Sequence, residues 1–358
     1  MIMAEPRRAE SRGKLVADLL FGAWRQLPPE LNTTTEDLEA VTPQLLGSGS
    51  SGLVWRRVNQ TALQASPAAF ELKQAYRLQS LYAGLHELEI EQIITLLHAA
   101  EIEPVLLKGR AIADLYPELA LRPYGDVDLC FKTEQYATAL AVLESPEGRA
   151  FNVDPHDDLD RLYGLSFDEL LTRSRMMRVG KIEVRVPCSE DHLRILCIHF
   201  LKHGAWRPLS LCDVAAALES RSDDFDWDRC LGTDKLITDW VACTIGLAHK
   251  LLGARTEDTP VTPRASRLPR WLLPAVLKQW EKPYPQANET TELMMTHLRK
   301  RSGVMRAMGM RWPNPIRATV YFRAPFNELP RFPFQLSNYV SQAARFLAAL
   351  PKALREQE

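Results

Sequence analysis

The chain has 358 residues, with 44 lysines and arginines against 45 aspartates and glutamates, so its formal net charge is −1. This length is enough for two or three structural units with a sizeable core. The balanced charge gives no strong signal for nucleic-acid binding, and no apolar run approaches the roughly 18 residues that a membrane span needs. The six cysteines show no Cys-x-x-Cys spacing, which indicates reduced thiols. We therefore expect a cytoplasmic protein without a membrane span.

The N-terminal part of the chain has the periodicity of helices. Residues 14–27 form an amphipathic pattern, and the segment 47–52 (GSGSSG) is expected to be a flexible loop, because it lacks the Lys-Ser/Thr that follows a phosphate-binding P-loop. Residues 67–99 give the clearest helical signal, with Pro67 suited to the first turn. The apolar positions that recur there at helical spacing are Leu78, Leu81, Tyr82, Leu85, Leu88, Ile93, Ile94 and Leu97.

Strand and helix patterns alternate over residues 104–188. Helices are predicted again from 189 to about 252, and residues 253–290 are rich in proline and charge, which is typical of a linker. We predict an α+β fold, with a small mixed-sheet core at 104–188 between an N-terminal helical region (1–103) and a C-terminal helical region (189–358). The expected strands are 104–107, 126–131, 150–155 and 181–186, and the expected helices between them are 110–116, 133–145 and 166–175.

Residues 104–131 carry the strongest chemical signal. An apolar run ends at Lys108-Gly109, and Asp126 and Asp128 follow on the next predicted strand. Side chains two residues apart on a strand point to the same face, so these carboxylates would repel each other unless a cation lay between them. Because hard divalent cations prefer carboxylate oxygens, the pattern suits Mg²⁺ and a nucleotide phosphate.

A series of sequence blocks that begins at Leu107-Lys108-Gly109 and ends at Asp213 resembles, in its residues and their order, the nucleotidyltransferase superfamily with the polymerase-beta-like core. The series is most similar to the bacterial uncharacterised nucleotidyltransferase family. The resemblance spans roughly residues 70–220. The chain departs from the superfamily at two places. It has Lys108-Gly109 rather than Gly-Ser at the turn after the first strand, and Pro155 directly follows Asp154, the third acid of the pattern. The matching blocks are Leu107-Lys108-Gly109, Leu115-Tyr116-Pro117, Arg122, Asp126-Val127-Asp128-Leu129, Val153-Asp154-Pro155-His156, Phe167-Asp168-Glu169-Leu170, His199 to His203, and Asp213.

The resemblance implies a reaction and a set of metal ligands. The expected activity moves an NMP group from an NTP, with ATP favoured, to a hydroxyl on a small molecule, sugar or peptide, and releases pyrophosphate with the help of Mg²⁺ or Mn²⁺. Asp126 and Asp128 would be catalytic and bind the metal, and Asp154 would be the third carboxylate. Since proline favours the end or edge of a strand, Glu183 on the strand at 181–186 stays open as an alternative third carboxylate.

The remaining blocks imply where the substrates bind. Lys108 and Gly109, at a strand-to-helix turn, would bind the triphosphate together with Arg110 and Arg122. The resemblance implies that His199 and His203, which share one helical face, contact the substrate, with Asp213 orienting one of them; a buried structural role is the alternative. The pair lacks the glutamate of a zinc protease motif.

Two other functions stay open at this stage. One is a protein modifier that attaches AMP to a side-chain hydroxyl, and the other is a nucleotide-binding scaffold that has lost activity. A basic segment at 299–311 could face an anionic acceptor, a membrane surface or simply solvent, and a last helix is expected at 336–350.

Overall fold

The computed structural model describes residues 11–157, 159, 163–283 and 312–342, and the structural statements below concern these residues. The N-terminal region is helical, as the sequence predicts. The segment 47–52 is not a flexible loop: Gly49, at φ 75°, ends one helix and Ser51 begins the next. The helices here are α1 (Arg12–Leu20), α2 (Thr35–Ser48), α3 (Ser51–Val58) and α4 (Pro67–Ala99), with a short 3-10 turn η1 (Ala62–Ala65) before α4.

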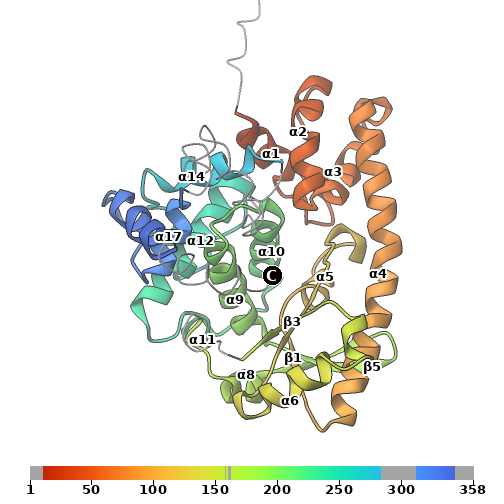
Figure 1. The fold of residues 1–358 in the computed structure, drawn as a ribbon. Helices are drawn as coiled ribbons and strands as arrows, with labels where there is room; N and C mark the ends of the chain where they lie inside the picture. The colour runs from red at the N-terminus through yellow and green to blue at the C-terminus, as the bar shows by residue number, and fades with distance from the viewer. Residues whose placement is uncertain (1–10, 158, 160–162, 284–311, 343–358) are drawn as a thin grey trace, which may run out of the picture.

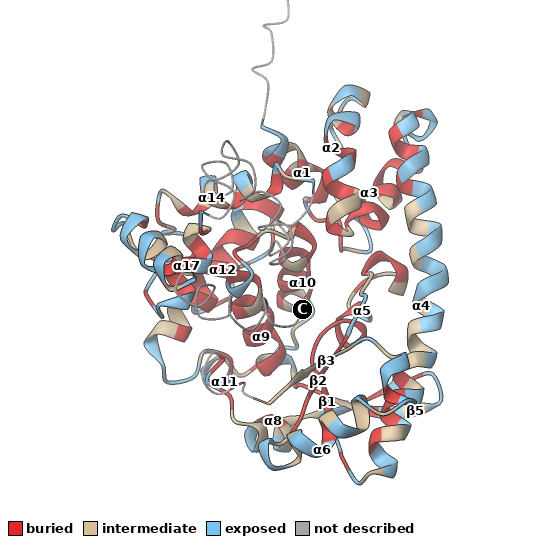
Figure 2. Cartoon of the chain, in the orientation of Figure 1, coloured by how far each residue is buried: buried red, intermediate tan, exposed pale blue. Residues whose placement is uncertain are grey.

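Helix α4 has 33 residues and runs along one side of the molecule (Figure 1). The hydroxyl of Ser66 accepts a hydrogen bond from the backbone N–H of Ala69 and Pro67 occupies the first turn, which explains why the helix begins where the sequence predicts. Its first turns pack on α3 and its last turns on the sheet. The middle of α4 presents an exposed outer face (Figure 2).

The sheet has five strands in the order β3-β2-β1-β5-β4 and mixes parallel and antiparallel pairs. The α+β fold predicted from the sequence is therefore confirmed. Strand β4 lies where the sequence predicts a loop after a helix ending near residue 175, and the helix ends earlier, at Arg173. The elements of this region are β1 (Val105–Leu106), α5 (Arg110–Ala113), η2 (Leu119–Leu121), β2 (Val127–Cys130), α6 (Thr133–Leu143), η3 (Gly148–Ala150), β3 (Val153–His156), α8 (Phe167–Arg173), β4 (Arg175–Val179) and β5 (Ile182–Val186).

The two faces of the sheet have different environments. Val127 and Leu129 of β2 pack with the last turns of α4 and with α6, in a hydrophobic cluster separate from the main core. Because side chains alternate along a strand, Asp128 and Cys130 point to the opposite face, toward the helices that follow the sheet. Cys130 joins the main core there, while Asp128 borders a cavity.

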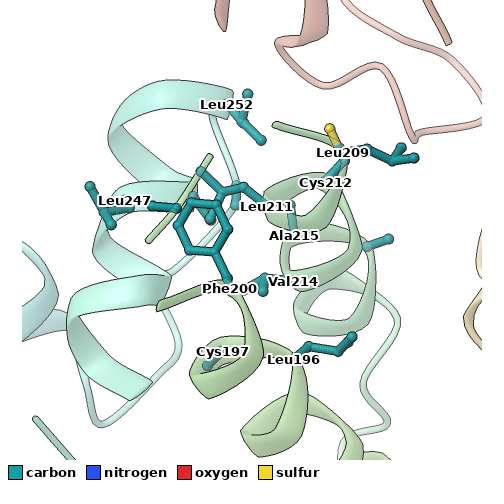
Figure 3. Close-up of a cluster of buried hydrophobic side chains, with 14 of the residues drawn as sticks. Leu196, Cys197, Phe200, Leu209, Leu211, Cys212, Val214, Ala215, Leu247 and Leu252 are labelled. Atoms are coloured by element: carbon teal, nitrogen blue, oxygen red, sulfur yellow. The ribbon is translucent and has the colours of Figure 1, made fainter. Parts of the chain in front are cut away.

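The C-terminal region packs its helices around that main core (Figure 3). The segment 253–280 is not a linker, since it forms α13 and α14, and α13 has a proline in its first turn. No described helix is long and apolar enough to cross a membrane. The basic segment 299–311 lies outside the described residues; the last helix begins at residue 332, earlier than predicted, and is described to residue 342. The other helices are α9 (Ser189–Lys202), α10 (Pro208–Glu219), α11 (Trp227–Leu231), α12 (Lys235–Leu252), α13 (Thr262–Ala265), α14 (Leu272–Trp280) and α17 (Pro315–Tyr321).

Candidate active site

Three carboxylates meet at one edge of the sheet. Asp128 of β2 lies directly beside Asp154 of β3 in the parallel register of these strands, and Asp126 precedes β2 by one residue. All three line a cavity of about 420 Å³ between the sheet and the helices α9 and α10. Asp126 and Asp128, which the sequence predicts to lie on one face of the strand, are therefore both found on the face that borders the cavity.

Two nitrogen groups contact the carboxylate of Asp128, which is only 6% exposed. Its Oδ1 lies 2.5 Å from the ammonium nitrogen of Lys108 and 3.1 Å from Nε2 of His156. The same Nε2 is 3.3 Å from Oδ2 of Asp154. His156 thus bridges the two neighbouring carboxylates, and Lys108 reaches Asp128 from the turn after β1.

The two acids of the Asp-x-Asp pattern differ in their protonation equilibria. Burial within the cavity raises the pKa of Asp126, and the negative charge of Asp128 adds to this effect. Burial also acts to raise the pKa of Asp128, but the hydrogen bond with His156 and the charge of Lys108 outweigh it and lower that pKa. Asp128 is therefore the firmly ionised member of the pair.

Helices α9 and α10 and the link between them supply the opposite wall. The ammonium of Lys108 donates to Nδ1 of His199 at 3.2 Å, and the rings of His199 and His203 lie 4.3 Å apart. Burial and then the charge of Lys108 lower the pKa of His199, while burial and then Lys202 lower that of His203 to about 4. Both rings are consequently neutral at pH 7, and His199 accepts a hydrogen bond rather than carrying charge.

The wall is cationic because of lysine and arginine. Lys202 and Arg207 line the cavity together with Lys108 and Arg122. Burial, followed by the charge of Lys108, lowers the pKa of Lys202, and burial lowers the pKa of Arg207 to about 10. Four basic side chains and three acids therefore line the same cavity. This arrangement suits a polyanionic ligand that is bound together with a cation.

Arg122 is held by a buried network behind the cavity. Its guanidinium donates to both oxygens of Asp213, at 3.1 Å and 2.7 Å, and the hydroxyl of Tyr116 donates to Asp213 at 2.7 Å. The pKa of Arg122 is raised, because the attraction of Asp213 exceeds the opposing effect of burial. Asp213 is not among the residues that line the cavity, and its hydrogen-bond partners are Arg122 and Tyr116 rather than a histidine.

Not every predicted residue reaches the cavity. Arg110 donates instead to Glu87 at 2.7 Å and to Asp114 at 2.6 Å, and Gly109, at φ 57°, forms the turn that carries Lys108 into the cavity without lining it. Glu183, the alternative third carboxylate, is also not among the residues that line the cavity.

The strand register explains the position of Glu183. Arg185 of β5 pairs with Val105 of β1, whereas Asp128 bonds through its backbone to Leu107. Glu183 therefore lies toward the other end of the sheet, about four residues or roughly 13 Å along the strand direction from the level of Asp128.

Sequence reasoning missed several residues that line the cavity. His156 stands two residues after Asp154, a spacing that already places it on the same strand face. Lys202 follows His199 by three residues on α9, a spacing that places both side chains on one side of the helix. The lining by Tyr124, Trp206, Arg207 and Ser210 depends on how α10 and the loop before β2 pack together, which local patterns do not encode.

The donor atoms fit a hard divalent cation. Asp128, Asp154 and His156 each offer a ligand atom, and these atoms lie within 4.8 Å of one another. Carboxylate oxygens suit Mg²⁺ and Mn²⁺, whereas imidazole nitrogen suits softer metals. The structure therefore brings Asp128, Asp154 and His156 together as candidate metal ligands, and Asp126 lines the same cavity.

Comparison with known proteins agrees with this geometry. A family model described as uncharacterised nucleotidyltransferase matches residues 35–148 and 145–253, which include every carboxylate and basic residue of the cavity. No curated protein and no solved structure matches the chain. Since the matched ranges cover more than half of the 358 residues, the chain belongs to the uncharacterised nucleotidyltransferase family.

Proposed function

We propose that the protein transfers an NMP group from an NTP, with ATP as the favoured donor, to a hydroxyl of an acceptor and releases pyrophosphate, with Mg²⁺ or Mn²⁺ bound at Asp126, Asp128 and Asp154. The observation that carries the proposal is the pairing of Asp128 with Asp154 in one register, on the face opposite a cationic wall. A divalent cation held there would neutralise phosphate charge and make the acceptor hydroxyl more acidic.

The basic residues would bind and orient the triphosphate. Lys108, Lys202 and Arg207 converge on the cavity from the turn after β1 and from the α9–α10 wall. Arg122 approaches with its guanidinium fixed by Asp213, so little conformational freedom is lost when it binds phosphate. These charges would hold the triphosphate with its α-phosphorus directed toward the carboxylates.

Asp154 would accept the proton of the attacking hydroxyl. Its side chain is about half exposed (52%), in contrast to that of Asp128, so an acceptor entering from solvent can reach it. His156 restrains its carboxylate through the contact at 3.3 Å, which favours one orientation for proton transfer.

The test is pyrophosphate release from each of the four NTPs, with Mg²⁺ and a panel of hydroxyl acceptors that includes sugars, peptides and a cell extract. Asp154→Asn is expected to lose release at least about 100-fold, the range of general-base catalysis, while the matched variant Glu183→Gln retains it. Binding with Ca²⁺ should persist without turnover, because its looser coordination fits in-line geometry less well.

Two results would contradict the proposal. Unchanged turnover in Asp154→Asn would remove that residue from the reaction. Tight, Mg²⁺-dependent NTP binding without pyrophosphate release for any acceptor would instead favour the inactive scaffold. Label transferred to protein in the extract would identify a protein AMP-transferase.

A further inference from the structure

The middle of α4 exposes a row of leucines that no described part of the chain covers. Leu78, Leu81, Leu85 and Leu88 are 52%, 70%, 52% and 53% exposed. They follow the spacing of a coiled-coil seam, alternating three and four residues. The sequence pattern predicts the helix correctly, but the leucines of its apolar stripe point away from the fold, and of the predicted apolar positions only Ile93, Ile94 and Leu97 are buried.

The stripe is symmetric about residue 83. Leu81 and Leu85 are equally distant from that centre, and so are Leu78 and Leu88. The symmetry extends outward to two glutamines, Gln74 and Gln92, and then to two apolar residues, Phe70 and Leu96. A helix with such a stripe, laid antiparallel on a copy of itself, matches apolar with apolar and amide with amide at every level over about 40 Å.

The charges of α4 favour the same orientation. Residues 67–83 carry Lys73 and Arg77 against one acid, whereas residues 84–99 carry Glu89, Glu91 and Glu87, the last paired with Arg110 of the same chain, and no lysine or arginine. An antiparallel pair brings the basic half of one helix to the acidic half of the other, and a parallel pair would place like charges together.

A glycine flanks this face near its midpoint along the helix. Gly84 is exposed, and a Cβ added to it would meet nothing within 4 Å, so the fold of a single copy does not require glycine there. Glycine lowers helix stability relative to alanine, but it allows two helix backbones to approach closely. Its position one residue from the symmetry centre places it where two copies would cross.

From these observations we propose that α4 is the interface of a homodimer, in which two copies pack antiparallel through Leu78, Leu81, Leu85 and Leu88 around a two-fold axis near residue 83. The inference is independent of the reaction at the carboxylates, since none of these leucines lines the catalytic cavity.

The oligomeric state of the full chain provides the first test. Light scattering coupled to size exclusion should give twice the chain mass of 40.6 kDa. The double variant Leu81→Glu/Leu85→Glu should give the monomer mass while keeping the wild-type circular dichroism spectrum, because both side chains are already exposed. Leu27→Glu, at a residue that is 89% exposed, is the matched control and should remain dimeric. A monomeric wild type, or a double variant that stays dimeric, would overturn the proposal.

Oxidative cross-linking tests the orientation. In the antiparallel dimer Gly84→Cys lies within two residues, about 3 Å along the helix axis, of its own counterpart, whereas Gln74→Cys lies opposite residue 92 of the second copy. Covalent dimers should therefore form with Gly84→Cys and not with Gln74→Cys. The six native cysteines are buried or half-buried, so the wild type serves as the background. Preferential cross-linking of Gln74→Cys would refute the antiparallel arrangement.

Discussion

Replacing Asp128 by asparagine should destabilise the fold, although two neighbouring acids suggest relief of repulsion. Asp128 and Lys108 both have side chains below 10% exposed and lie 2.5 Å apart. Breaking a buried ion pair by removing one partner costs about 3–5 kcal/mol, because the other charge is left uncompensated. The asparagine oxygen can still accept a hydrogen bond from Lys108, and Asp126 remains nearby, so we expect a loss of about 2–4 kcal/mol.

Asp126→Asn is the matched comparison for this effect. Its pKa is raised by burial and by Asp128, so neutralising it removes an unfavourable charge, and stability should stay within about 0.5 kcal/mol of the wild type or increase. The assay is urea unfolding followed by circular dichroism at pH 7.5 with a chelator. Equal stability of Asp128→Asn and the wild type, or an equal loss in both variants, would refute the role assigned to Lys108.

Three further predictions follow from the buried charges. Asp213→Asn should cost about 3–5 kcal/mol, since Arg122 would stay buried without its counter-charge, whereas Asp114→Asn, which removes an exposed partner of Arg110, should change stability by less than about 1 kcal/mol in the same unfolding assay. Burial and then the charge of Arg175 lower the pKa of His192 to about 3. The contribution of this histidine to the free energy of unfolding is therefore fully present above about pH 6.5 and is lost as the pH falls toward 3, by up to about 1.4 kcal/mol per pH unit. The free energy of unfolding measured across this range should depend less steeply on pH in His192→Asn, and an unchanged slope would contradict the assignment. Lys108→Met should weaken NTP binding more than NMP binding in calorimetry, and equal losses for the two nucleotides would remove Lys108 from the triphosphate site.

The sequence was most informative where the determining interactions are local. The start of α4 follows from Ser66 and Pro67, and the side-chain alternation expected for a strand at 126–131 correctly placed Asp126 and Asp128 on one face. The proline that made Asp154 uncertain is accommodated on β3, which is the edge strand of the sheet.

Interactions between distant segments could not be predicted in the same way. Arg110 and Arg122 look alike in the sequence, yet one pairs with α4 and α5 and the other with Asp213 of α10. The linker predicted after residue 253 failed because its prolines occupy first helical turns or lie between helices, where they are compatible with packed structure. The composition of a segment did not reveal whether neighbouring helices would bury it.

The Arg122–Asp213 pair also limits how this protein can evolve. The two residues are 91 positions apart in the chain, and Tyr116 adds a third contact from another segment. A single substitution at either position passes through a form with an unpaired buried charge, which is strongly disfavoured, so change should proceed only by joint replacement. Across related chains, positions 116, 122 and 213 should therefore vary together, and recombination that separates the segments containing them should yield proteins that fold poorly.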